Sequence, residues 1–421
     1  MKQMRAYFNV LKLRINRALK REAVFNFPIE AYIEPTSFCN LRCPACPTGL
    51  RLGERPFASI DEDLFKSTID QLGDYVFLLW MYNWGEPLLH KRTPELIRYA
   101  KSKELTVILS SNLSIRLSDE YIERLVKSGL DTMIVSLDGA SAETYERYRL
   151  GGNFDLVREN MLRIQESKAR LGVSAPRVVW QFLVFEHNEH ELQIAASLYQ
   201  QWGADEIKIA PAEMPLETYN PGLKPSTLSE YNMYHRDNSL VKETVKQMNG
   251  SRACSWLYGT FVLNPNGKVS ACCGVSAEKN DFGEYQAGSD FFQIWNNDKF
   301  RRARRLFATL DQHPAKAALD ERQTEEIVKR IDGMAMGVTL DESELICHQC
   351  PIPFRQSDAD LTILNIAYQL AHTFVHDPSL LKKSRSVIAY LLMGAPYWKR
   401  ILQEAVAKIS GPRRLATHSV R

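Results

Sequence analysis

Short apolar runs alternate with longer helical patterns between residues 31 and 211, and this alternation constrains the fold more than any other feature. The expected strands cover residues 31–34, 76–82, 106–110, 132–137, 177–183 and 206–210. Apolar residues recur at three-to-four spacing over 61–72, 94–102, 118–128, 155–171 and 189–202, which predicts helices. Repeated strand–helix units form parallel sheets. We therefore predict an α/β fold whose strands form a partial (β/α)6 barrel.

At 421 residues the chain exceeds one ordinary domain, so a second unit is expected. We predict a basic amphipathic segment (1–28), a TIM-like partial barrel (29–215), a polar linker or capping segment (216–253), a small cysteine-rich β-hairpin/α domain (254–355) and a helical tail (356–421). A helical insertion is expected at 310–345. A turn at 265–267 predicts a hairpin that brings Cys254 and Cys272 together.

Composition and charge exclude several classes. A hydrophobic share of 45% and a charged share of 24% are typical of folded globular chains. The 53 basic and 50 acidic residues are too balanced to indicate nucleic-acid binding. No stretch has the pattern of a signal peptide, and no apolar run approaches the ~20 residues that a membrane span needs. We therefore predict a cytoplasmic protein.

The first 22 residues mix apolar side chains with many cations, which predicts an amphipathic helix. Two positions for such a helix are possible. It can pack on the barrel, or it can lie on an anionic membrane face and give the protein a peripheral membrane contact.

Eight cysteines in a long chain without export signals indicate metal binding or catalysis rather than disulfides. Cys39, Cys43 and Cys46 have the spacing C-x3-C-x2-C directly after the first strand. A 4Fe-4S cluster normally takes four thiolates, so three leave one iron open, as a catalytic site requires. The alternative is a structural zinc site completed by a distant ligand.

Further polar residues follow the next strands. Asn83, Trp84, Gly85 and Glu86 follow the second strand, Ser111 and Asn112 the third, and Ser136 and Asp138 the fourth, while Gln181 lies on the fifth. In a parallel barrel the carboxyl ends of the strands meet at one face, so these side chains should gather near the cysteines. Any one of them alone could be a turn or capping residue.

Together these motifs resemble the radical SAM superfamily, in which S-adenosylmethionine (SAM) chelates the open iron. Gly85-Glu86-Pro87 resembles the family's glycine–glutamate motif, with Trp84 where glycine is common, and implies that Asn83, Trp84, Gly85 and Glu86 hold the SAM amino group. The resemblance also places Ser111, Asn112, Ser136, Asp138, Arg149 and Gln181 at the ribose, carboxylate or adenosine of SAM. Ala45 replaces the usual aromatic residue before the last cysteine.

The second set of cysteines resembles the SPASM and twitch extensions of the same family. The resemblance implies one auxiliary 4Fe-4S cluster with Cys254, Cys272, Cys347 and Cys350 as its ligands. Cys272 is preferred over Cys273 because neighbours on an extended strand point to opposite faces. A zinc ribbon is the alternative.

The implied reaction is reductive cleavage of SAM to a 5′-deoxyadenosyl radical, which abstracts hydrogen from an organic substrate. A peptide or protein side chain and a small sugar-like or alcohol metabolite are both candidate substrates for net oxidation or another C–H modification. A reducing partner such as flavodoxin or ferredoxin is implied. A non-catalytic zinc or electron-transfer iron–sulfur protein is the alternative function. A nucleic-acid modifying protein is disfavoured because basic residues do not cluster beyond the N-terminal segment.

Overall fold

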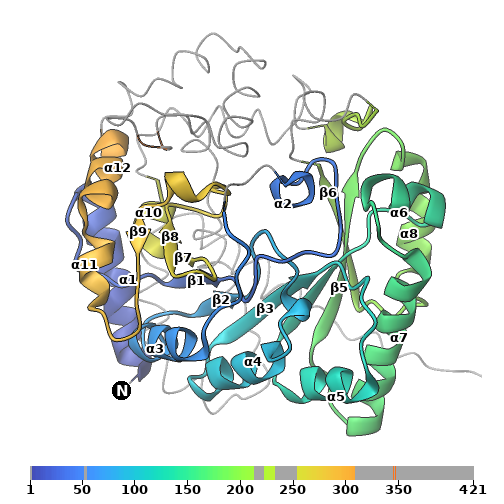
Figure 1. The fold of residues 1–421 in the computed structure, drawn as a ribbon, viewed down its shortest axis with the longest axis horizontal. Helices are drawn as coiled ribbons and strands as arrows, with labels where there is room; N and C mark the ends of the chain where they lie inside the picture. Colours follow the sequence, from blue (N-terminus) through green and yellow to red (C-terminus); the bar gives the residue numbers. More distant parts are fainter. Residues whose placement is uncertain are drawn as a thin grey trace, which may run out of the picture. The chain divides into compact units, whose positions relative to one another are not determined.

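The computed structural model describes residues 2–51, 55–212, 222–232 and 254–308, together with residues 345 and 347. The strands of these residues form one mixed sheet in the order β6-β5-β4-β3-β2-β1-β7-β8-β9 (Figure 1). Strands β1 to β6 pair in parallel, as does β7 with β1. The predicted α/β class with a partial parallel barrel is confirmed. The predicted tail (356–421) and most of the predicted linker and insertion lie outside the described residues.

The barrel strands lie close to their predicted positions. They are β1 (Glu30–Ile33), β2 (Leu78–Trp80), β3 (Thr106–Ser111), β4 (Thr132–Ser136), β5 (Arg177–Val184) and β6 (Glu206–Pro211). The differences are confined to strand ends, and the largest is at β2, which is shorter than expected.

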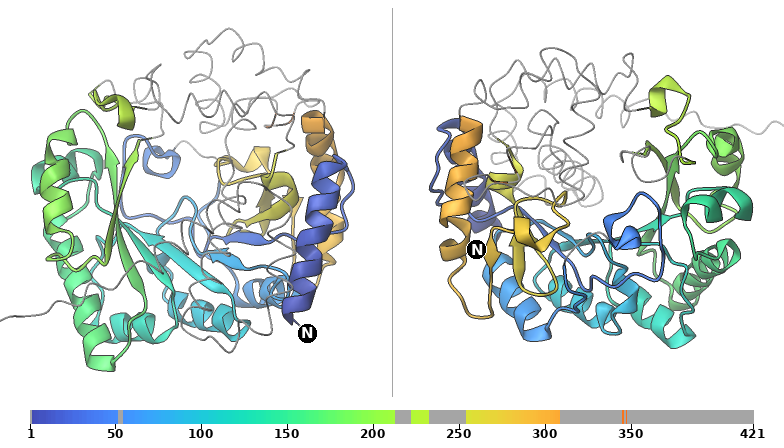
Figure 2. Two further views of the ribbon diagram at one scale, coloured as in Figure 1. Left: turned by 180° about the vertical axis from the view of Figure 1, so that it is seen from behind. Right: turned by 45° about the horizontal axis from the view of Figure 1, so that its top comes forward.

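The helices between the strands are α3 (Glu62–Leu72), α4 (Thr93–Ser102), α5 (Asp119–Lys127), α6 (Ala142–Tyr148), α7 (Phe154–Leu171) and α8 (Leu192–Leu198). Four of these six, α3, α5, α6 and α7, begin at a capping side chain. Side chains of Asp61, Ser118 and Asn153 accept backbone N–H groups at the starts of α3, α5 and α7. Gly172 ends α7 in the left-handed region, with φ 65°. These helices cover the outer face of the sheet (Figures 1 and 2).

Two helices differ from prediction. The segment expected to be one helix over 189–202 is a short 3-10 turn (Glu189–Glu191) followed by α8. Glu189 accepts a hydrogen bond from Ser226, and Glu191 accepts the Ala140 N–H, which ties this turn to neighbouring segments. Helix α6 was not predicted as an element, although its start has an ordinary signal in the Ser141 side chain.

The sheet has two chemically different faces. Val107 and Leu109 on β3, like Met133 and Val135 on β4, are fully buried on the helix side. Side chains that alternate with them point to the inner face, as the two-residue period of a strand requires. Register places Ser136, Gln181 and Lys208 side by side on β4, β5 and β6. The inner face therefore carries a polar row near the carboxyl ends of the strands.

The predicted hairpin extends the barrel sheet. Strand β7 (Thr260–Leu263) pairs with β1 from Glu30↔Thr260 to Ile33↔Leu263 and turns back into β8 (Lys268–Ser270), next to β9 (Gly283–Glu284). A buried ion pair strengthens the junction, because the Arg55 guanidinium donates to both Asp281 oxygens at 2.7 and 2.9 Å. The hairpin and barrel therefore share one sheet and one apolar core.

The remaining described helices lie at the edge beyond β7. They are α1 (Lys2–Ala18), α10 (Trp256–Gly259), α11 (Phe291–Trp295) and α12 (Asp298–Ala308), and the short α2 (Pro47–Leu50) follows the cysteine loop. Figures 1 and 2 both show α1 beside α12. None of the helices in the described ranges has the length and apolar character to cross a membrane.

Candidate active site

The loop after β1 brings Cys39, Cys43 and Cys46 together. The Cys46 N–H donates to the Cys43 carbonyl at 3.1 Å, and the Cys43 and Cys46 thiols are near enough to Cys39 to raise its pKa further. At Gly49, which follows in α2, a Cβ would lie 2.5 Å from the Cys43 carbonyl oxygen, so only glycine fits there. The compact loop thus depends on a residue three positions beyond the last cysteine.

Apolar side chains surround this loop. Cys43 is part of a buried cluster with Leu41, Ala45, Tyr148, Phe185, Ala212 and Leu223. Burial raises the pKa of Cys39 to about 12 and that of Cys43 to about 11. These thiols would stay protonated without a bound cation, and metal binding is what drives such thiols to thiolates. Ala45 occupies this cluster, whereas Phe38 lies outside it and stacks on Phe57 with centroids 5.1 Å apart.

The geometry fits a multi-iron cluster better than a single metal ion. Among the described residues, no three His, Cys, Asp or Glu side chains converge as closely as one metal ion would require. In a four-iron cluster each thiolate binds its own iron, so wider spacing is appropriate.

Arg149 and Asp138, both predicted at SAM, form a buried ion pair instead of two independent groups. Arg149 Nε and one of its terminal nitrogens lie 2.6 Å from Asp138 Oδ2, and Oδ1 accepts the Leu183 N–H at 2.7 Å. Another terminal nitrogen of Arg149 lies 3.9 Å from Cys43 Sγ. Asp138 therefore orients Arg149, and Arg149 provides positive charge beside the cysteine loop.

Glu86 is held in a network with Ser111 and Asn112. Its Oε1 accepts from Ser111 Oγ at 2.8 Å and from the Leu88 N–H at 3.0 Å, and its Oε2 accepts the Asn112 N–H at 2.7 Å. Asn112 Nδ2 in turn lies 3.8 Å from Cys39 Sγ. Burial raises the pKa of Glu86 to about 7. The structure thus brings together the predicted residues of the second and third loops and the first cysteine.

The backbone of the Trp84–Gly85 turn is fixed by Glu34, a residue that the sequence reasoning missed. Glu34 Oε1 accepts the N–H groups of Trp84 and Gly85, each at 2.6 Å. A Cβ on Gly85 would lie 2.0 Å from the Thr36 carbonyl oxygen, which explains the glycine. Glu34 ends the predicted first strand, and a charged residue at the buried end of a strand was the available signal.

Glu34 also lines a pocket. A pocket of about 170 Å³ is lined by Glu34, Ser37, Pro47, Thr48, Arg51, Arg55, Phe57, Trp84 and Ser276. Glu34 Oε2 and Trp84 Nε1 are buried without a hydrogen-bond partner among the described residues, as is Asn83 Nδ2. Burial raises the pKa of Glu34 to about 7. Unpaired buried polar atoms are costly, so this turn is a place where a bound group would supply missing hydrogen-bond partners.

Ser136 and Gln181 lie together on the inner face, with Lys208 next in the same row. The register puts the three side chains on one face of the sheet, with Ser136 at the carboxyl end of β4 and the other two within their strands. Lys208 is exposed there.

The second set of cysteines lies around the start of α10 and the end of β8. Cys254 raises the pKa of Cys272, so the two thiols are close, as the hairpin predicted. Backbone N–H groups of Trp256 and Leu257 donate to Cys254, and those of Gly274 and Val275 donate to Cys272. Cys254 and Cys272 pack against the main apolar core, to which the buried Cys347 belongs. Cys350 lies outside the described residues.

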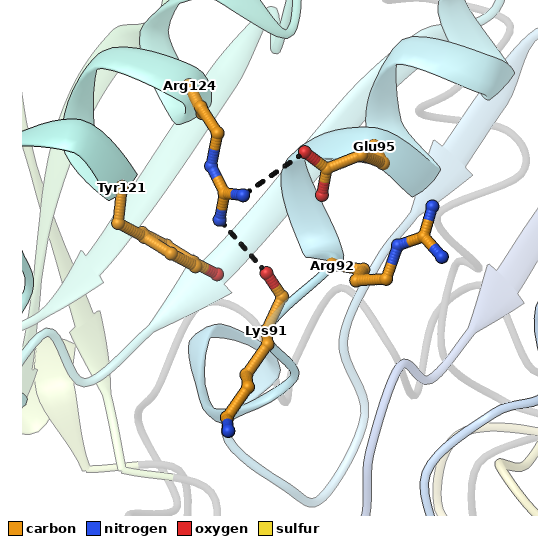
Figure 3. Close-up of a pocket in the computed structure, with 5 residues that line it drawn as sticks. All are labelled: Lys91, Arg92, Glu95, Tyr121 and Arg124. Atoms are coloured by element: carbon orange, nitrogen blue, oxygen red, sulfur yellow. Dashed lines mark hydrogen bonds and ion pairs between the residues drawn. The ribbon is translucent and has the colours of Figure 1, made fainter.

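A larger pocket, about 560 Å³, lies between α4 and α5 (Figure 3). Lys91, Arg92, Glu95, Tyr121 and Arg124 line it. Arg124 pairs with Glu95 at 3.5 Å and donates to the Lys91 carbonyl at 3.2 Å. None of the predicted cofactor residues is in this pocket, so its size does not make it the active site.

A parallel β/α barrel with an open three-thiol site at the carboxyl ends of its strands defines a class of iron–sulfur enzymes. The family model for the radical SAM superfamily matches residues 33–186, and that for the SPASM iron–sulfur cluster-binding domain matches residues 254–319. The chain is a radical SAM enzyme with a C-terminal SPASM domain. It binds SAM with a 4Fe-4S cluster in the first domain and auxiliary iron–sulfur in the second. The non-catalytic alternative is therefore set aside.

Several known proteins are similar to this chain. AdoMet-dependent heme synthase of Methanosarcina barkeri is 32% identical over 127 residues, which span 30% of this chain and 36% of that protein. Mycofactocin maturase MftC of Mycolicibacterium smegmatis is 24% identical over 291 residues, 65% of this chain and 72% of the relative. PqqA peptide cyclase of Rhodopseudomonas palustris is 23% identical over 301 residues, 66% and 77% of the two chains. SuiB of Streptococcus suis shares the fold, with a TM-score of 0.54, 16% identity and 70% of each chain covered.

Proposed function

We propose that this enzyme oxidises, or otherwise modifies at a C–H bond, a side chain of a peptide or protein. An alignment over two thirds of the chain supports this substrate class, because that relative is a peptide cyclase. When bound, SAM and the first cluster supply a deoxyadenosyl radical that takes a hydrogen atom, and the auxiliary cluster supplies an electron acceptor. A flavodoxin or ferredoxin would deliver the reducing electrons in the cytoplasm, where thiols stay reduced.

The observation that carries net oxidation is the aromatic contact between the two cysteine sites. Trp256 lies two residues after Cys254, and its ring centroid is 5.3 Å from that of Tyr32 on β1. Tyr32 stacks on Trp80 at 5.4 Å and meets Tyr82 edge-on at 6.1 Å. Tyr82 directly precedes the Asn83–Glu86 turn. A substrate bound on this inner face would therefore lie between both sites.

The predicted cofactor residues divide the binding of SAM among them. Glu86 and the backbone of Asn83, Trp84 and Gly85 would hold the SAM amino group, since a carboxylate accepts hydrogen bonds from an ammonium. The ion-paired Arg149 would offset negative charge at the thiolate loop. Ser111, Asn112, Ser136 and Gln181 would contact the sugar and base. Cys39, Cys43 and Cys46 would bind the first cluster, and Cys254, Cys272, Cys347 and Cys350 the second.

Glu34 is our candidate for the group that accepts the proton during oxidation. Removing a hydrogen atom from a C–H bond and then an electron from the resulting carbon radical leaves a cation. The neighbouring O–H or N–H group must then release one proton to give the oxidised C=O or C=N product. Glu34 lines the 170 Å³ pocket, its Oε2 is buried without a hydrogen-bond partner among the described residues, and burial raises the pKa of its carboxyl to about 7. A base is most effective when its pKa is near the working pH.

A small sugar-like or alcohol metabolite is the second candidate substrate. The pocket beside Glu34 has room for a small polar molecule, and its unpaired carboxylate oxygen and Trp84 N–H suit hydroxyl groups.

The test is anaerobic reconstitution with iron and sulfide, followed by SAM, reductant and separate pools of short peptides or of sugars and alcohols. Peptides should increase the formation of deoxyadenosine, and mass spectrometry should show a product that is lighter than the peptide by two hydrogen atoms. Stimulation by sugars and alcohols alone would reject the peptide assignment. Glu34→Gln keeps an oxygen for the Trp84 and Gly85 N–H groups, so SAM cleavage should persist while oxidised product falls at least tenfold. Unchanged product would remove Glu34 from the reaction.

A further inference from the structure

Helix α1 is attached to the protein through only one of its faces. Ala6, Val10 and Leu13 are buried there. Asn9 exchanges two hydrogen bonds with the Phe27 backbone, at 2.8 and 2.9 Å, and the Asn16 amide donates to Asn26 at 2.7 Å. This face therefore holds α1 in a fixed orientation.

The opposite face of α1 is apolar and exposed. Five large apolar side chains are exposed there, the last of them directly after the helix. Their exposed fractions are 62% for Met4, 58% for Phe8, 46% for Leu11, 39% for Ile15 and 62% for Leu19. At about 100° per residue these five side chains fall within one arc of about 80°. A contiguous apolar stripe on a surface helix marks an interaction site more often than scattered apolar residues do.

Cations border this stripe on both sides. Arg5 and Lys12 follow it along one edge and Arg14 along the other, and all three are exposed. Arg5 is paired with Asp74 at 2.5 Å, whereas no carboxylate among the described residues pairs with Lys12 or Arg14. The helix contains no Asp or Glu. Its exposed half is thus apolar at the centre and positive at the edges.

We propose that this face of α1 docks on an anionic membrane surface. An amphipathic helix with this pattern lies in the plane of the interface, with its apolar face among the acyl chains and its cations at the head groups. Lys12 and Arg14 have long side chains that can reach upward to lipid phosphates while Phe8 and Leu11 are inserted.

Charge argues against a second copy of the chain as the occupant. Helices that pair through an apolar seam place complementary charges along its edges. Two α1 helices would bring only cations to their shared edges, because neither helix has an acidic residue. An anionic bilayer instead complements both edges at once. The helix is about 26 Å long, so its binding should be reversible and salt-sensitive.

The test is flotation of the full-length protein with vesicles of phosphatidylcholine alone or with 30% phosphatidylglycerol. One variant combines Phe8→Ser, Leu11→Ser and Ile15→Ser, and another combines Lys12→Glu and Arg14→Glu. All five side chains are exposed, so the fold should not change. Matched controls are Leu162→Ser with Ile194→Ser, which are 40% and 47% exposed, and Lys91→Glu with Arg98→Glu, all remote from α1.

We expect binding to the anionic vesicles only, weakened at least tenfold in both α1 variants and by 0.5 M salt, and unchanged in the controls. Equal binding of the α1 variants, or no binding of the unmodified chain, would overturn the proposal. So would a concentration-dependent dimer that the α1 variants abolish, since a second copy would then cover the stripe. SAM cleavage should be the same in all variants, which separates this outcome from a failure of the proposed function.

Discussion

The two cysteine sites share a sheet but differ in their surroundings. Around Cys39 and Cys43 the neighbours include an amide and a guanidinium, Asn112 and Arg149, at 3.8 and 3.9 Å from sulfur. Cys254 and Cys272 receive backbone N–H groups, as Cys39 and Cys46 also do, and they pack against the main apolar core. The difference therefore lies in the polar side chains beside the first site, which can rearrange around a ligand and so suit a reacting site.

The largest expected effect separates the two sites completely. Replacing Cys39, Cys43 and Cys46 with alanine should abolish deoxyadenosine formation but leave the auxiliary iron, because the second site lies on a different loop. Iron analysis and product assay of anaerobically purified protein check this. Continued SAM cleavage by the triple variant would show that the first cluster is elsewhere.

The next effect concerns the auxiliary site, which is formed by the second set of cysteines. Cys272→Ala should remove the auxiliary cluster's iron, since Cys272 lies beside Cys254. Cys273→Ala, its matched control, should retain that iron. Iron content and electronic spectra decide between the neighbours, and the reverse result would exchange their assignments. Zinc in place of iron would end the electron-acceptor role of this site.

A smaller effect is expected from a substitution in the polar network beside the first cysteine site. Glu86→Gln should weaken SAM binding by roughly 1.5 to 3 kcal/mol, because one charge-assisted hydrogen bond is lost. Iron content should not change. Glu191→Gln, another buried carboxylate replaced by its amide, should bind SAM normally. Equilibrium binding gives the comparison, and a wild-type affinity in Glu86→Gln would exclude its contact with the amino group.

The last prediction concerns how the free energy of unfolding depends on pH. Burial raises the pKa of Glu34 and of Glu86 to about 7 in the folded chain, so folding favours their protonated forms. Their contribution is fully present below about pH 4.5 and is lost as the pH rises through 7. Each shift corresponds to about 3 kcal/mol. Denaturant unfolding of cluster-free protein at pH 5 and 8 should show the loss, and either Gln variant should reduce it. If the free energy of unfolding changed between pH 5 and 8 by the same amount in the variants as in the unmodified protein, the assignment would be wrong.

Local patterns were sufficient to predict the parallel strands, most helices and the residues that gather at the first site. Strand order beyond the barrel was not predictable in the same way, because the β1–β7 pairing joins residues more than 200 positions apart. The partnership of Asp138 with Arg149 was likewise hidden, since both were assigned to SAM separately. Glu34 was missed because a charge next to Pro35 is typical of an ordinary strand end. Each omission concerns a contact made only after folding.

The β1–β7 pairing has a consequence for how this protein can be divided. Proteins of several domains can often be expressed piece by piece, but a cut between residues 232 and 254 would remove β7 and leave β1 paired only with β2. The bare strand would offer a row of unsatisfied N–H and C=O groups, a template for pairing with other chains. Glu30 and Ile33, both fully buried in the intact sheet, would lose that cover as well. The barrel on its own should therefore aggregate, and the SPASM domain cannot be treated as a removable accessory.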